Sequence, residues 1–119
     1  MRTFVIGDIH GCLYTLNRLL DKLNVNFQED RLIFLGDYID RGVNSIPILL
    51  TICCMKINYP DKVHILRGNH ETLSINKYNS FFRECDKMNG RILFIHFNNL
   101  FKTLPIAAVV KTQTKNYFL

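Results

Sequence analysis

Three short segments of the sequence combine glycine with the side chains that bind metal ions and phosphate. They read GDIHG at residues 7–11, GDYIDRG at 36–42 and RGNHE at 67–71. Carboxylate, imidazole and amide groups supplied from several directions are the ligands that divalent ions take in proteins. Two acids three residues apart, with an arginine beside the second, do not fit a core segment, because unpaired charge is costly to bury. The segments therefore predict a metal site formed by loops.

Four residues in these segments are candidate metal ligands. Asp8 and His10 are two residues apart, a spacing at which both side chains of an extended loop can reach one ion. Asp37 has two carboxylate oxygens and can bridge two ions, while Asn69 offers a carbonyl oxygen to the second. Two divalent ions about 3.5–4 Å apart can activate water and clamp both ends of an in-line displacement at phosphorus. The candidate ligands therefore favour hydrolysis of a phosphoester.

Three further residues fit the remaining roles of such a site. His70 can protonate the leaving oxygen as a general acid, and Asp40 can hold the other ring nitrogen of that histidine. Arg41 has the planar fork that grips phosphate oxygens in pairs. His64, inside an apolar strand pattern, and His96, between phenylalanines of a helical pattern, are expected to be packed or surface histidines instead. Each of these groups alone could be an ordinary surface residue, so the prediction rests on their combination in three glycine-marked loops.

Apolar runs before the three segments predict the strands that deliver them. These strands are expected at residues 3–7, 32–35 and 63–66. Leucines at helical spacing after Gly11 predict a helix of about 12 residues, and the apolar run 46–57 predicts a buried helix that Asn44 or Ser45 can cap. Strand, helix, strand, helix, strand favours a parallel sheet with right-handed crossovers. The first strand is expected at its centre, because it leads directly into the first acidic loop.

The second half of the chain is less regular, and it makes the expected fold class α/β with a mixed α+β continuation. Two helices are predicted, over residues 80–88 and 92–104, separated by Asn89 and Gly90. A fourth strand is predicted over 106–110, followed by a polar turn at 111–115 and a fifth apolar run at 117–119.

Composition limits the classes of function. The 119 residues fit one domain, and 48% apolar content is enough for a core. A formal charge of +5 suits an anionic substrate, but the basic residues are scattered, so no nucleic-acid partner is expected. The apolar run after Arg2 stops at Gly7, too early for a signal peptide. No apolar stretch approaches the roughly 20 residues of a membrane span, so no membrane partner is expected either.

The four cysteines form no CxxC pair. Cys53 and Cys54 lie within an apolar helical pattern and are expected to be small packing groups, and Cys12 and Cys85 are isolated. Such a set is typical of a reduced, intracellular protein rather than of a disulfide framework, so a cytoplasmic or nuclear location is expected.

Taken together, the three loop segments resemble the amino-terminal motifs of the calcineurin-like metallophosphoesterases, and most closely those of the phosphoprotein (Ser/Thr) phosphatases. Residues 74–76 (SIN), 82–85 (FREC) and 104–110 (LPIAAVV) also resemble that branch. The resemblance implies a β-sandwich flanked by helices, of which this chain would be the first half. It also implies two divalent ions (manganese, iron or zinc), a phosphoprotein substrate and regulatory subunits as partners.

The same resemblance implies a role for each candidate residue. The first ion would be bound by Asp8, His10 and Asp37, and the second in part by Asp37 and Asn69. The catalytic acid would be His70, oriented by Asp40, and phosphate would be contacted by Arg41.

The sequence also departs from the family pattern. Family members continue after the strand at 106–110 into a His-Gly-Gly segment and a later histidine, which complete the second metal site, and into a further arginine and tyrosine that contact phosphate. No counterpart of these exists among the 119 residues. The resemblance therefore implies a partial domain over 1–119, cut before the His-Gly-Gly segment and nearly inactive alone. Three functions stay open: a protein serine/threonine phosphatase, a hydrolase of dinucleotide polyphosphates or another phosphoester, and a non-catalytic fragment that binds regulatory partners.

Overall fold

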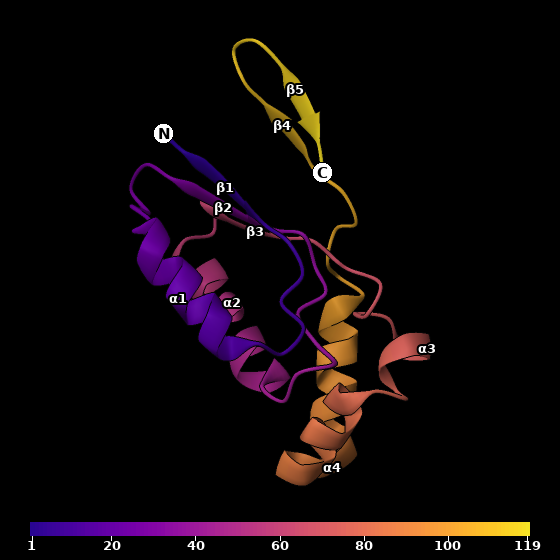
Figure 1. Cartoon of the computed structure of the whole chain (residues 1–119). Coiled ribbons are helices and arrows are strands. Elements are labelled where there is room, and N and C mark those ends of the chain that lie inside the picture. Colours follow the sequence, from indigo (N-terminus) through magenta and orange to yellow (C-terminus); the bar gives the residue numbers. More distant parts are fainter.

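The computed structural model describes residues 1–119 and has the mixed α/β character that was predicted (Figure 1). In chain order the elements are β1 (Thr3–Ile6), α1 (Leu13–Leu23), β2 (Arg31–Phe34), α2 (Ser45–Asn58), β3 (Val63–Ile65), α3 (Leu73–Asn76), α4 (Ser80–Phe101), β4 (Val109–Lys111) and β5 (Asn116–Phe118). The alternation of strand and helix from β1 to β3 confirms the predicted start of the fold.

The strands β1, β2 and β3 form a parallel sheet with β2 in the middle. The expectation that the first strand lies at the centre is therefore wrong for this sheet. β2 contributes three successive buried residues, Leu32, Ile33 and Phe34, as expected of a parallel strand covered on both faces. β1 instead leaves Val5 46% exposed, as an edge strand can.

The three strands of this sheet end together. Ile6 pairs with Phe34, and Phe34 pairs with Ile65, so the last residues of the strands lie in register. The loops that follow therefore leave from one edge of the sheet, where ligand sites of open α/β sheets form. This arrangement brings the three glycine-marked segments together.

Helices α1 and α2 cover one face of the sheet (Figure 1). Leu32, Phe34 and Val63 are fully buried and share a core with Leu16 of α1 and Ile52 of α2. Burying a Leu, Ile or Phe side chain stabilises a fold by about 1.5–3 kcal/mol. This core therefore fixes the sheet, and with it the loops at its edge.

Helix α4 contains the break that the sequence predicts. Asn89 has φ −152° and Gly90 has φ 62° with ψ −155°, so two helical halves meet at a kink. The second half ends at Phe101 rather than at Leu104, because the amide groups of Thr103 and Leu104 bond only three residues back, to Leu100 and Phe101. The buried aromatic face of α4 consists of Phe81, Phe94, Phe97 and Phe101.

Two local features differ from the predictions. Helix α3 was not predicted, because its four residues are too few to show a helical period. Neither Asn44 nor Ser45 caps α2 with its side chain. The Glu84 carboxylate of α4 instead accepts the backbone N–H groups of Ser45 at 2.9 Å and Ile46 at 2.8 Å. A carboxylate from a remote helix thus satisfies the free donors at this helix end.

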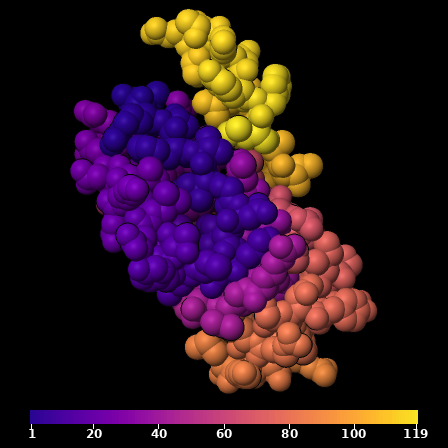
Figure 2. Space-filling model, viewed as in Figure 1, coloured from indigo at the N-terminus to yellow at the C-terminus, as the bar shows by residue number.

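The strands β4 and β5 form an antiparallel hairpin that projects away from the rest of the chain (Figures 1 and 2). The strand predicted over 106–110 begins only at Val109, where pairing with β5 starts. Ile106 and Ala107 have no strand partner. The fifth apolar run is β5. Ile106 and Phe118 are 80% and 81% exposed, so the hairpin contributes apolar side chains that nothing covers.

All four cysteines are free. Cys85 is fully buried, and this burial raises the pKa of its thiol to about 12. Cys53 is half-buried, but Cys54 is exposed, so the expectation that both pack within the fold is wrong for Cys54. None of the helices combines the length and the apolar character that crossing a membrane requires.

Candidate metal centre

Glycines allow the three loops to touch. Gly36, with φ +110°, lies so close to Gly68 that an added Cβ would meet the Gly68 nitrogen at 2.1 Å. A Cβ on Gly68 would meet the Oδ1 atom of Asp37 at 2.2 Å. Gly11, with φ +71°, packs in the same way on Gly42, because an added Cβ on Gly11 would meet the Gly42 carbonyl carbon at 2.7 Å. No side chain fits at these contacts, which explains why each loop carries glycine.

The backbone at the centre is strained. Four non-glycine residues there have positive φ angles: His10 (45°), Asp37 (51°), Asp40 (69°) and Arg41 (66°). Such conformations cost of order 1–3 kcal/mol each and persist only where the surrounding structure enforces them. The enforcing contacts include hydrogen bonds from the Ile9 and His10 amides to the Asp37 carbonyl, at 3.0 and 2.9 Å. Strain concentrated at one place is typical of a functional site.

Glu71 holds the second and third loops together from beneath. Its carboxylate is fully buried and accepts the backbone N–H groups of Asp37 at 2.8 Å, Tyr38 at 2.8 Å and Gly68 at 2.9 Å. Burial raises the pKa of the Glu71 carboxyl, and the three donors act in the opposite direction. Sequence reasoning missed this role, although an acid directly after His70 in a glycine-marked loop was an available signal.

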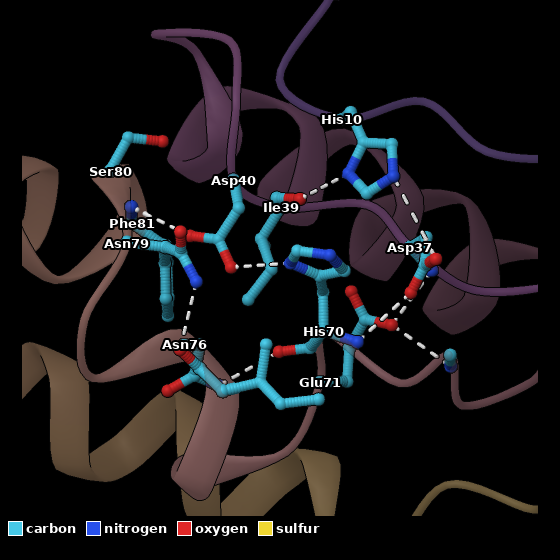
Figure 3. Close-up of polar contacts among 12 residues, drawn as sticks. His10, Asp37, Ile39, Asp40, His70, Glu71, Asn76, Asn79, Ser80 and Phe81 are labelled. Carbon is cyan, nitrogen blue, oxygen red and sulfur yellow. Dashed lines mark hydrogen bonds and ion pairs between the residues drawn. The ribbon is translucent and has the colours of Figure 1, made fainter.

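His10, Asp37 and His70 form the core of the centre (Figure 3). One potential ligand atom from each lies within 4.8 Å of the others. The Nδ1 atom of His10 lies 2.7 Å from the Ile39 carbonyl oxygen, which can only accept. Nδ1 therefore carries the proton, and the lone pair of Nε2 faces the centre, 3.7 Å from the Oδ2 atom of Asp37.

Asn69 adds an amide to this group. Turned with its nitrogen toward Asp37, the amide donates to Oδ1 at 3.1 Å and to Oδ2 at 2.9 Å. Turned the other way, its oxygen faces only acceptors, an arrangement that a cation between them would stabilise. A neutral imidazole, a carboxylate and an amide oxygen are together a ligand set that suits zinc, manganese or iron, so the residues present fit a divalent ion.

His70 is oriented by buried partners. Its Nδ1 atom lies 2.8 Å from the Oδ2 atom of Asp40, whose side chain is fully buried (Figure 3). Asp40 also accepts the Phe81 amide at 3.0 Å. The Nδ2 atom of Asn76 donates to the His70 carbonyl at 3.1 Å and to Asn98 at 2.9 Å. The contact predicted between His70 and Asp40 is therefore present, and α3 and α4 support it through residues that sequence reasoning missed.

Asp8 and Arg41 have exposed side chains. The side chain of Asp8 is 67% exposed, and its Oδ2 atom lies 3.8 Å from Nε2 of His10, close to the 3.7 Å between that nitrogen and Oδ2 of Asp37. Of the predicted site residues, the structure thus brings together His10, Asp37, Asn69, His70 and Asp40, and it places the exposed carboxylate of Asp8 beside His10. The three-residue cluster includes His70, which the sequence predicts to serve in proton transfer.

The two other histidines lie outside the cluster. His64 is half-buried in β3, where burial and then the charges of Lys56 and Arg31 lower its pKa. His96 is exposed on α4.

Two proteins named as protein phosphatases are similar to this chain. A Caenorhabditis elegans protein named "Putative serine/threonine-protein phosphatase C06A1.3" is 42% identical over 109 residues, which are 92% of this chain and 30% of that protein. The structure of a Saccharomyces cerevisiae protein serine/threonine phosphatase with similarity to human phosphatase PP5 matches with TM-score 0.85 and 34% identity, over 88% of this chain and 33% of that one.

A third likeness concerns the fold alone. A structure described as "Crystal structure of a putative diadenosine tetraphosphatase" matches with TM-score 0.60 and 18% identity, over 97% of this chain and 55% of that one. This chain spans about a third of the length of the two phosphatases. The calcineurin-like phosphoesterase family model matches residues 1–119 throughout. The chain belongs to the calcineurin-like phosphoesterase family.

Proposed function

We propose that this chain supplies the amino-terminal metal- and phosphate-binding loops of a protein serine/threonine phosphatase, a metal-dependent hydrolase of phosphate monoesters. The observation that carries the proposal is the convergence of His10, Asp37 and His70 at one sheet edge, with Asp40 on the far nitrogen of His70. The names of the relatives at 42% and 34% identity support the protein phosphatase branch. The match to the tetraphosphatase, at 18% identity, supports only the fold.

The residues that would hold metal follow from the ligand set. We assign Asp8, His10 and Asp37 to one divalent ion, and Asp37 with Asn69 to a second. When bound, such ions supply Lewis-acid chemistry at phosphate oxygens. Asp8 is exposed, so its carboxylate is free to turn toward the centre when an ion binds.

His70 is assigned to proton transfer. Its Nδ1 atom faces the buried Asp40 carboxylate, so a second proton on the ring resides on Nε2, which lies on the side of the metal cluster. Asp40 stabilises the resulting imidazolium and keeps the ring in place, as the acid in a carboxylate–histidine pair does. Arg41, exposed beside Asp40, is available to pair with two oxygens of a phosphate.

We infer that residues 1–119 act as part of a larger catalytic domain, because the matched stretch is about a third of each phosphatase relative. Within this chain the second ion has only two protein ligands, Asp37 and Asn69, so we expect very low phosphatase activity from the isolated chain. Metal-dependent turnover of a phosphopeptide by the isolated chain, abolished by Asp37→Asn, would contradict this division.

The function is tested in a chimaera that joins residues 1–119 to the part of the C. elegans relative that follows the matched stretch. We expect metal-dependent hydrolysis of phosphoserine and phosphothreonine peptides. His70→Asn should lower kcat by about 10²–10⁴-fold with bound metal retained, the size of a general-acid effect. His96→Asn, an exposed histidine outside the cluster, is the matched control. Hydrolysis of diadenosine tetraphosphate in preference to the peptides would favour a dinucleotide polyphosphate hydrolase. No turnover of either substrate would favour the non-catalytic function.

A further inference from the structure

A buried pair of asparagines connects His70 to helix α4. The Nδ2 atom of Asn76 donates to the His70 carbonyl oxygen at 3.1 Å and to the Oδ1 atom of Asn98 at 2.9 Å (Figure 3). Asn98 lies on the second half of α4 and donates in turn to the Phe94 carbonyl at 3.0 Å. Asn76 is fully buried and Asn98 is 6% exposed, so solvent hardly competes for these contacts.

The orientation of the Asn76 amide is fixed by its partners. Both hydrogens on Nδ2 face oxygen acceptors, and turning the amide over would bring its own oxygen against them. In this orientation the Oδ1 atom of Asn76 is buried without a hydrogen-bond partner, which is costly. The two donors, rather than the oxygen, are therefore what this side chain contributes, and one of them is placed on His70.

Helix α4 thus holds His70 at two points. Its first half acts on the ring, because the Phe81 amide donates to Asp40 at 3.0 Å and Asp40 lies 2.8 Å from Nδ1 of His70. Its second half acts on the backbone of His70, through Asn98 and Asn76. A ring held only at Nδ1 can still shift with its backbone. The second contact is therefore needed to fix where Nε2 lies.

We propose that Asn76, held in place by Asn98, is a positioning residue for His70. It acts on the His70 backbone rather than on substrate, and so keeps Nε2 of the ring directed at the metal cluster. The proposal rests on the proposed function, in which His70 transfers a proton. In such a reaction a displacement of about 1 Å can lower the rate by about 10²-fold.

The test uses the Nδ1 proton of His70, which reports the contact with Asp40 in nuclear magnetic resonance spectra of the full chain. Asn76→Leu keeps the size of the buried side chain and removes both donors. Exchange of the Nδ1 proton with water should become about tenfold faster or more, because His70 loses its backbone support. Asn79→Leu is the matched control, because the Asn79 side chain donates to the Ile75 carbonyl at 2.9 Å instead, and it should change the rate by less than about twofold. An unchanged rate in folded Asn76→Leu, or an equal rise in both variants, would overturn the proposal.

Two further measurements decide the matter if Asn76→Leu does not fold. Asn98→Leu leaves the contact between Asn76 and His70 but frees the other donor, and should raise the exchange rate of the Nδ1 proton by about threefold. In the unsubstituted chain, the side-chain N–H groups of Asn76 should exchange about 10²-fold more slowly than those of the exposed Asn99. Exchange as fast as that of Asn99 would show that Asn76 holds nothing, and an unchanged rate with Asn98→Leu would overturn the role of Asn98.

The chimaera with the C. elegans sequence separates positioning from a general loosening of the loops. Asn76→Leu should lower kcat for phosphopeptides by about tenfold or more, with KM and bound metal unchanged. A raised KM or lost metal with kcat unchanged would overturn positioning. A chimaera without any turnover would contradict the proposed function, and the exchange rates in the chain alone would still decide whether Asn76 positions His70.

Discussion

The loop centre lies at the edge of the parallel sheet, and an apolar groove of about 550 Å³ lies beside the same sheet, lined by residues of β2, β3, α2, the end of α4 and the stretch that follows it. The side chains of these two regions are held in different ways. At the centre, Glu71 alone accepts three backbone N–H groups, and Asp40 accepts the Phe81 amide and contacts His70. In the groove, the lining is mainly apolar and the buried Nε atom of Arg31 has no partner. Each region also has one buried polar atom without a partner, the Oδ1 atom of Asn76 next to the centre and the Nε atom of Arg31 in the groove.

This difference separates two requirements of the fold. Local chemistry positions the candidate catalytic side chains, because strained loops are enforced by buried carboxylates and by glycine contacts. The groove lining is instead mainly apolar, and some of its side chains, such as Ile57, are exposed. Substitutions in the centre should therefore be costly in the chain alone, and exposed substitutions in the groove should be nearly neutral.

The largest effect is expected from Gly68→Ala. An added Cβ would lie 2.2 Å from the Oδ1 atom of Asp37, 2.3 Å from the Asp37 amide nitrogen and 2.7 Å from the Oε2 atom of Glu71, so the two loops must separate. We expect the free energy of unfolding to fall by at least about 3 kcal/mol. Gly7→Ala, where a Cβ meets nothing within 4 Å, should change it by less than about 1 kcal/mol. Equal values for the two variants in urea unfolding would show that the loops do not touch as described.

A smaller loss is expected from Glu71→Gln. The amide that replaces one carboxylate oxygen faces backbone N–H groups and cannot accept from them, so at least one buried donor loses its partner. The expected cost is about 2 kcal/mol in urea unfolding. Glu84→Gln is the control, because Glu84 is less buried than Glu71 and its carboxylate accepts two N–H groups rather than three, so it should cost about 1 kcal/mol. A larger loss from Glu84→Gln would place the main clamp outside the centre.

The sequence predicted the polar residues that gather at the centre, but not the contacts that hold them there. Asp37, His70 and Asp40 were predicted because polar residues after apolar strands have few structural explanations, and the structure gathers them. The support from Glu71 and Asn76 was missed, because each depends on a contact made by a distant loop or helix. Strand order and the capping of α2 failed for the same reason: both are decided by tertiary packing, which a local pattern does not contain.

The Asp30 carboxylate lies just before β2 and, like that of Glu71, accepts backbone N–H groups. Its contribution to the stability of the fold can be measured through the pH dependence of Tm. The side-chain hydrogen bond from Arg2, together with the Arg2 and Asn26 amides, holds the pKa of the Asp30 carboxyl well below its ordinary value. A depressed pKa means that the ionised form stabilises the fold above the unfolded pKa of about 3.9. That contribution is lost as the pH falls toward the folded pKa.

Asp30→Asn should therefore lower Tm at pH 7 and narrow the difference between Tm at pH 7 and at pH 3. Asp21→Asn is the control, because Asp21 is an exposed helix residue without an ion pair. This substitution should leave Tm at pH 7, and the difference between Tm at pH 7 and at pH 3, unchanged. A pH dependence that Asp30→Asn leaves unchanged would mean that the contact with Arg2 does not form in solution.

The smallest effect is expected in the groove. Leu100→Asp lies in the groove lining at a site that is 37% exposed, and Ile95→Asp lies outside the lining on the same helix at 54% exposed. Both should change the free energy of unfolding by about 1 kcal/mol or less. Exposed apolar patches favour self-association, so we expect the chain to associate through the groove. Only Leu100→Asp should reduce this association in light scattering, because it interrupts the apolar patch. The same reduction from Ile95→Asp would mean that the groove is not the adhesive surface.

The central claim is that the three loops form a metal centre in which Asp37 is a ligand and His70 is not. Titration of the full chain with manganese or zinc, followed by calorimetry, tests it most directly. Asp37→Asn should weaken binding by about tenfold or more, because it removes the carboxylate between the loops. His70→Asn should leave the affinity within about threefold, because Asp40 directs its ring toward proton transfer. Equal loss in both variants would make His70 a ligand, and undiminished binding by Asp37→Asn would contradict the metal centre itself.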